Sequence, residues 1–114
     1  MSVKLTTRQV GDVTVIDAVG RITLGEGAST FRDRVRELAS SGRKKLLLNL
    51  AEVSYIDSSG IGELVSGFTS VANQGGTLKL LNLTKRVKDL LQITKLYTVF
   101  EVHEDEAAAV RSFA

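Results

Sequence analysis

Residues 46–62 read LLLNLAEVSYIDSSGIG, an apolar run that leads through a short polar turn into a glycine-flanked segment. From Leu46 to Leu50 the run is apolar on both faces of an extended chain, which is typical of a central strand covered on both sides in a parallel or mixed sheet. After Gly60, apolar residues recur at helical spacing, namely Ile61, Leu64, Val65, Phe68, Val71 and Ala72. The stretch therefore predicts a strand, a turn and an amphipathic helix.

The flanking sequence extends this unit into an α/β domain. β-Branched residues on either side of Gly11-Asp12 predict a β-hairpin whose second strand ends at Gly20. The resulting order, β-β-α-β-α-β-α-β-α, predicts a mostly parallel central sheet with an antiparallel N-terminal hairpin at its edge. The chain of 114 residues allows one domain, 1–114. The last four elements are expected to be a strand over 77–83, a short helix capped by Thr84, a strand over 98–102 and a helix over 104–113.

The first helix has an ambiguous beginning. Thr23 and Glu26 have the spacing of a capping box, in which each side chain accepts a hydrogen bond from a backbone N–H of the first turn. Gly25 and Gly27 weaken that turn, so a clean start is expected only near Ala28. Further along, an apolar face at helical spacing predicts an amphipathic surface helix that ends at Ser41-Gly42, with Phe31, Val35, Leu38 and Ala39 pointing inward.

Composition excludes several kinds of function. The chain has no Cys and one His, His103, so thiolate metal sites are excluded and most acid–base relays are disfavoured. The formal net charge is +2, and few aromatic residues accompany the cations, so a direct nucleic-acid role is weakly supported. The start of the chain lacks a signal peptide, and the longest aliphatic run, Leu46-Leu47-Leu48, is too short for a membrane span. We expect a cytoplasmic protein that is not an enzyme and needs no cofactor or metal.

The turn Asp57-Ser58-Ser59-Gly60 is the segment that carries usable chemistry. It connects a strand to a helix, where free N–H groups favour an anion such as a phosphate on Ser58. Helix capping is the simpler interpretation, because Asp and Ser are common N-cap residues. A catalytic serine is disfavoured, since no Gly-x-Ser-x-Gly motif is present. A phosphoacceptor role for Asp57 is disfavoured too, because no acidic pair follows the first strand.

Several segments taken together resemble the STAS domain, most closely that of bacterial anti-sigma factor antagonists. The resemblance rests on the segment 48–62 and extends in order over essentially the whole chain, through Gly20, the segment 75–78 and the segment 87–91. It implies a protein-interaction switch without catalysis. The unphosphorylated antagonist would bind an anti-sigma factor that is also a serine kinase and so release sigma factor. Phosphorylation of Ser58 would prevent that binding, and a serine phosphatase would reset it.

The resemblance also implies a contact surface. It would be formed by the residues around Ser58 and by the following helix, with no direct contact to nucleic acid or membrane. The expected partner-binding residues are Asp57, Ser58, Ser59, Gly60, Ile61, Glu63 and Thr23, with Ser66 as a further candidate. Thr23 stands where many relatives carry an Asp, which puts in doubt the contacts to the kinase and the phosphorylation of Ser58.

Two alternatives stay open. The first is a STAS module that acts as a scaffold or senses a nucleotide or lipid in a larger signalling assembly, in which Ser58 would not be phosphorylated. A small esterase using Ser58 is disfavoured because no base is expected nearby. Basic residues also gather around the first helix, where they indicate either a solvated face or a site for an acidic partner, namely Arg32, Arg34, Arg36, Arg43, Lys44 and Lys45.

Overall fold

The apolar run at 46–50 lies in β3 (Lys45–Ile56), the central strand of a five-stranded sheet in the computed structural model, which describes residues 3–113. β3 pairs in parallel with β2 (Val13–Ile22) on one side and with β4 (Thr77–Leu81) on the other. Both faces of the run are covered, because Leu46, Leu47 and Leu48 are each fully buried. The central position predicted for this segment is therefore confirmed.

The two edges of the sheet differ in kind. β1 (Val3–Val10) pairs antiparallel with β2 through a tight turn in which Gly11 has a φ of 62°. β5 (Val102–His103) pairs in parallel with β4 at the other edge. The sheet order is β1-β2-β3-β4-β5, so the mixed sheet with an antiparallel N-terminal hairpin is as predicted.

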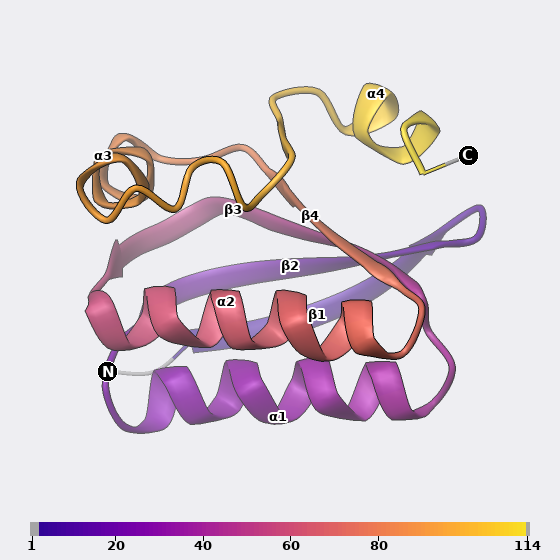
Figure 1. Cartoon of the computed structure of the whole chain (residues 1–114), viewed down its shortest axis with the longest axis horizontal. Coiled ribbons are helices and arrows are strands. Elements are labelled where there is room, and N and C mark those ends of the chain that lie inside the picture. Colours follow the sequence, from indigo (N-terminus) through magenta and orange to yellow (C-terminus); the bar gives the residue numbers. More distant parts are fainter. Residues whose placement is uncertain (1–2, 114) are drawn as a thin grey trace.

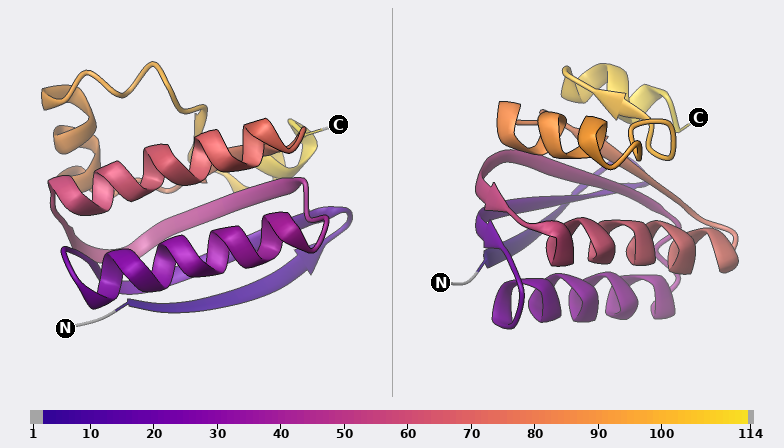
Figure 2. Two further views of the ribbon diagram at one scale, coloured as in Figure 1. Left: turned by 60° about the horizontal axis from the view of Figure 1, so that its bottom comes forward. Right: turned by 60° about the vertical axis from the view of Figure 1, so that its left-hand side comes forward.

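The helices cover the sheet unequally. α1 (Glu26–Ser40) and α2 (Ser58–Asn73) lie side by side on one face, whereas the short α4 (Glu106–Arg111) lies on the other (Figures 1 and 2). α3 (Lys85–Ile93) contacts both β3 and α2. The sequence order of strands and helices agrees with the prediction.

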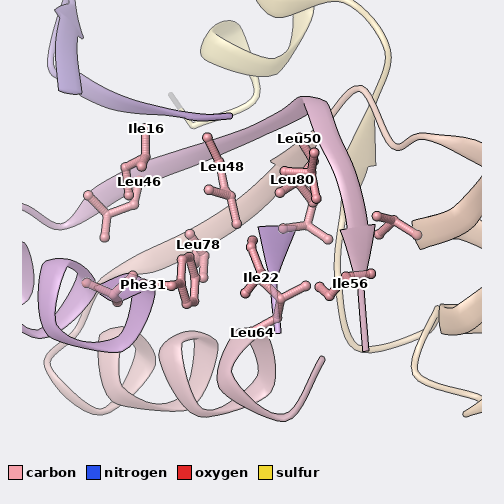
Figure 3. Packing of buried hydrophobic residues seen from close by; sticks show 14 of the residues in the cluster. Ile16, Ile22, Phe31, Leu46, Leu48, Leu50, Ile56, Leu64, Leu78 and Leu80 are labelled. Carbon is pink, nitrogen blue, oxygen red and sulfur yellow. The ribbon is translucent and has the colours of Figure 1, made fainter. Parts of the chain in front are cut away.

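The main core lies between the sheet and the α1–α2 pair. Leucine and isoleucine side chains of β2, β3 and β4 project toward Phe31 of α1 and Leu64 of α2, as Figure 3 shows. A smaller cluster on the opposite face packs Val13, Val15, Leu47 and Leu81 against Ala109 of α4. These contacts fix where β3 ends and α2 begins, and so they position the turn at 57–60.

Three predictions near the first helix are wrong, and one of them is its beginning, which lies at Glu26 and not near Ala28. β2 does not end at Gly20 but continues to Ile22, because Arg21 and Ile22 still pair with Tyr55 and Ile56. The capping box does not form either. Gly25 is the N-cap of α1, and no side chain caps that end. Its φ of 96° suits glycine, so the chain turns here without the hydroxyl of Thr23.

The C-terminal elements are shorter than predicted. β4 ends at Leu81, and the strand expected over 98–102 is reduced to Val102–His103. The residues before it form turns that bury Phe100 against Phe68 of α2, with ring centroids 5.6 Å apart in an edge-to-face arrangement. Tertiary packing of this aromatic pair thus outweighs local strand propensity. Ala72, which we expected on the buried face of α2, is exposed.

Candidate functional site

Asp57 joins two segments at the end of β3. It is the N-cap of α2, where its Oδ1 accepts a hydrogen bond from the backbone N–H of Gly60 at 2.9 Å. Its Oδ2 accepts a second hydrogen bond from the backbone N–H of Leu24 at 3.0 Å. The carboxylate therefore caps the start of α2 and also holds the loop between β2 and α1 beside it.

The hydrogen bonds around Asp57 keep its carboxyl group ionised. Partial burial alone would raise the pKa of Asp57, but backbone N–H groups, led by those of Leu24 and Gly60, outweigh burial and lower the pKa below its ordinary value. A fixed negative charge thus lies next to Ser58 at neutral pH.

Ser58 and Ser59 open α2 and differ in exposure. Ser58, the first residue of the helix, is exposed, whereas Ser59 is half-buried. The hydroxyl group of Ser58 is therefore open to solvent at a helix N-terminus, where unpaired backbone N–H groups favour added negative charge. Of the two adjacent serines, Ser58 is the more accessible one.

Gly60 and Ile61 lie inside the fold. Gly60 is buried, and a Cβ atom at this position would stand 2.0 Å from the carbonyl oxygen of Ile22 and 2.6 Å from Cγ1 of Ile56. Ile61 is 2% exposed and belongs to the main core. Both were expected at a contact surface. In the structure Gly60 lies directly against Ile22 of β2 and Ile56 of β3, and Ile61 is buried in the main core.

Thr23 and Leu24 form the other wall of the site. The register that pairs Ile22 with Ile56 brings Thr23 next to Asp57, and Thr23 is half-buried. Leu24 is 79% exposed, although its backbone is held by Asp57. Sequence reasoning did not single out this leucine. An apolar residue in a glycine-containing loop was the available signal, but its position beside Ser58 depends on the tertiary structure.

Glu63 forms an ion pair between the two neighbouring helices. Its Oε2 lies 3.7 Å from Nη1 of Arg32 on α1, so it bridges α2 to α1. Within residues 3–113, the buried atoms Glu63 Oε1 and Arg32 Nε have no hydrogen-bond partner. Glu63, expected to contact a partner, is thus half-buried at the edge of the α1–α2 pair.

The basic residues around α1 are mostly engaged locally. Lys45 forms an ion pair with Asp12 at 2.6 Å, and Arg43 donates to the side-chain oxygen of Gln9 at 2.8 Å. Three others contact acidic side chains of the helices or a backbone carbonyl, namely Arg32, Arg34 and Lys44. This arrangement favours the solvated-face interpretation of that cluster.

A metal site and a site for a phosphate-bearing ligand find less support in the structure. Within the described part of the chain, no three His, Asp or Glu side chains are grouped to hold a metal ion. A hollow of about 380 Å³ near the end of β4 is lined by Ala51, Asn82, Leu83, Thr84 and Glu104. That lining has a carboxylate and no cation, which is unsuited to a phosphate-bearing ligand.

None of the helices in residues 3–113 has the length and apolar character that a membrane span requires.

Comparisons with known proteins agree with this geometry. A family model for the STAS domain matches residues 4–109. The chain is 32% identical over 111 residues to the anti-sigma-B factor antagonist of Bacillus subtilis (strain 168), which covers 97% of this chain and 100% of that protein.

Solved structures show the same fold. An anti-sigma factor antagonist from Mycobacterium paratuberculosis superposes with a TM-score of 0.86 at 15% identity, covering 98% of this chain and 94% of that one. The phosphorylated form of the Bacillus cell fate determinant SpoIIAA superposes with a TM-score of 0.75 at 18% identity, covering 97% and 100%. The match of the family model to residues 4–109, together with the similarity to the Bacillus subtilis protein over 97% of this chain, shows that the chain belongs to the STAS domain family.

Proposed function

We propose that this protein is an anti-sigma factor antagonist whose binding is switched off by phosphorylation of Ser58. The unphosphorylated form binds an anti-sigma factor that is also a serine kinase, and sigma factor is released. A serine phosphatase restores the binding-competent form. The protein acts in the cytoplasm as a binding partner and carries out no catalysis, and it contacts neither nucleic acid nor membrane.

The observation that carries this proposal is the exposure of Ser58 at the first position of α2, directly after the ionised carboxylate of Asp57. A phosphoserine adds about −1.5 to −2 charges at neutral pH. That charge adds to the negative charge of Asp57 directly before it, and a partner that packs on the neutral hydroxyl group would have to desolvate it. Binding is lost without any change of fold.

The contact surface in this proposal has an apolar part and a polar part. Ser58 and Ser59 offer hydroxyl groups, Thr23 contributes its side chain, and Leu24 offers an exposed apolar group. Asp57 holds Leu24 in place, whereas Gly60 and Ile61 shape the turn from inside. Glu63 lies at the margin of this surface, where Arg32 holds it. Thr23 supplies no negative charge, although the family resemblance implies an Asp at its position.

The experiment is co-expression with candidate anti-sigma factor kinases from the native genome, followed by intact-protein mass spectrometry and peptide mapping. We expect one added phosphate on Ser58 that is lost in Ser58→Ala and retained in the matched variant Ser59→Ala. A phosphate that maps elsewhere would contradict the switch. Binding without phosphorylation by any kinase would indicate an antagonist that is constitutively active, with Thr23 as the cause.

The rival function, a scaffold or ligand-sensing module, gives a different result. Such a module would show no phosphate and no anti-sigma factor binding. It would show instead a saturable rise in melting temperature with a small molecule, because a ligand that binds only the folded state stabilises it.

A further inference from the structure

Tyr55 lies between two arginines that come from different elements. Its ring centroid is 5.8 Å from Cζ of Arg21 on β2 and 4.4 Å from Cζ of Arg86 on α3. Arg21 pairs with Tyr55 in the β2–β3 register, and Arg86 is the second residue of α3. Sixty-odd residues of sequence separate the two cations, so the fold alone brings them to one ring.

Neither arginine is neutralised within the described chain. Among residues 3–113, no carboxylate lies within 4.0 Å of Arg21 or Arg86. Arg8, by contrast, is paired with both Asp17 and Glu106. Two like charges held against one ring repel each other, so a negative partner at this place would be favoured.

The contact with the ring leaves hydrogen-bonding capacity free. A guanidinium stacked on an aromatic ring uses its flat face, while its N–H donors lie along its edge and remain available for a carboxylate. Both arginines are exposed and Tyr55 is half-buried. The ring therefore limits the motion of the two side chains and presents their donors to solvent.

The arginines lie at the same end of the sheet as Ser58. Arg21 and Tyr55 are followed by the paired residues Ile22 and Ile56, and then by Thr23 and Asp57. The chain from Tyr55 to Ser58 is three residues long. The two guanidinium groups therefore lie around a residue that is close to Ser58 in the chain, at the end of β3 that leads into α2.

We propose that Arg21 and Arg86, which both lie over the Tyr55 ring, bind carboxylate side chains of the anti-sigma factor and so form a second, electrostatic part of the docking surface. This inference rests on the proposed function, because it names the chemistry of the same partner's surface. A nucleic acid fits less well, since the Tyr55 ring, which could otherwise stack on a base, already contacts both guanidinium groups. Complementary charges of this kind raise the rate of association and make it salt-dependent.

The test uses the full chain and the anti-sigma factor that the co-expression experiment identifies. Association and dissociation rates are measured by surface plasmon resonance at several salt concentrations for the double variant Arg21→Glu/Arg86→Glu. We expect an association rate roughly tenfold or more below that of the unaltered protein at low salt, with a weaker salt dependence. The melting temperature is recorded for every variant.

The matched control is Arg36→Glu/Arg111→Glu, which changes the net charge equally at exposed arginines of α1 and α4. If both double variants slow association to the same extent, the effect comes from net charge and the inference is wrong. If Arg21→Glu/Arg86→Glu binds as the unaltered protein does while Ser58→Asp does not bind, the proposed function holds and this inference alone fails. If the unaltered protein binds no anti-sigma factor, both fail. Should the charge reversal unfold the protein, Arg21→Gln/Arg86→Gln is expected to slow association to a smaller extent, and an unchanged rate would overturn the inference.

Discussion

The carboxylate of Asp57 accepts a hydrogen bond from the backbone N–H of Leu24 at 3.0 Å, across a separation of 33 residues. The same carboxylate caps α2 through the N–H of Gly60. One side chain thus fixes both the start of the helix that carries Ser58 and the loop that presents Leu24. The two halves of the proposed contact surface are coupled through this group.

Replacement of Asp57 tests that coupling. Asp57→Ala removes both hydrogen bonds and is expected to lower the free energy of unfolding by about 1 to 2 kcal/mol, the cost of a lost N-cap. Urea denaturation measures this change, and amide hydrogen exchange at Leu24 is expected to become faster. Asp57→Asn keeps one acceptor oxygen, so it should lose less stability. Unchanged exchange at Leu24 in Asp57→Ala would show that the loop is held by other contacts.

A charge at position 58 is expected to separate binding from stability. Ser58→Asp adds a negative charge to an exposed first-turn position that favours it, so the free energy of unfolding should change by less than about 0.5 kcal/mol. Affinity for the anti-sigma factor is expected to fall roughly a hundredfold, which corresponds to about 3 kcal/mol. Isothermal titration calorimetry provides the affinity. The control Thr69→Asp places the same charge at an exposed position later in α2 and should bind normally.

Two glycines near the start of α2, Gly60 and Gly62, form a matched pair. A Cβ atom at Gly60 would overlap the backbone of Ile22, whereas one at Gly62 would meet no atom within 4 Å. Gly60→Ala is expected to destabilise the protein by about 3 kcal/mol or more. Gly62→Ala should stabilise the helix by about 0.5 to 1 kcal/mol, because alanine loses less backbone entropy on folding. Equal melting temperatures for the two variants would mean that α2 shifts away from β2 at little cost.

Acid is expected to weaken the attachment of the C-terminal segment. Lys79 is buried, with its Nζ 2.8 Å from Glu101 Oε2 and 2.9 Å from the carbonyl oxygen of Ser112. The hydrogen bond from Lys79, followed by that from His103, lowers the pKa of Glu101 to about 2. The folded-state pKa of Glu101 lies below the ordinary value of 4.5. The stabilisation by its ion pair with Lys79 is therefore complete above pH 4.5 and is lost as the pH falls toward 2.

The variant Lys79→Met isolates this contribution. It is expected to reduce the loss of unfolding free energy between pH 5 and pH 2, measured by urea denaturation at a series of pH values. Arg8 lowers the pKa values of Asp17 and Glu106 through hydrogen bonds, so part of the pH dependence should remain. Lys95→Met, at an exposed residue, is the control and should keep the full pH dependence of the unfolding free energy. If Lys79→Met showed the same pH dependence of the unfolding free energy as the unaltered protein, the Lys79–Glu101 ion pair would not be its source.

The sequence by itself determined the order of strands and helices and the position of the turn at Asp57 and Ser58. These features depend on local patterns: the apolar run of β3 requires cover on both faces, the 3.6-residue spacing of α2 requires a buried stripe, and Asp57 has the side chain of an N-cap. Each pattern is complete within a few residues of chain. The resulting predictions therefore needed no knowledge of neighbouring elements.

Only the tertiary structure decided which distant groups meet. The hydrogen bond between Asp57 and Leu24, the bridge from Glu63 to Arg32 and the contacts of Arg21 and Arg86 with the Tyr55 ring all depend on the β2–β3 register and the docking of α1 and α3. The shortened β5 has the same origin, since burial of Phe100 against Phe68 outweighs local strand propensity. Such contacts form only after the core has packed, because the residues involved lie far apart in the chain and none of them carries a local signal for its partner.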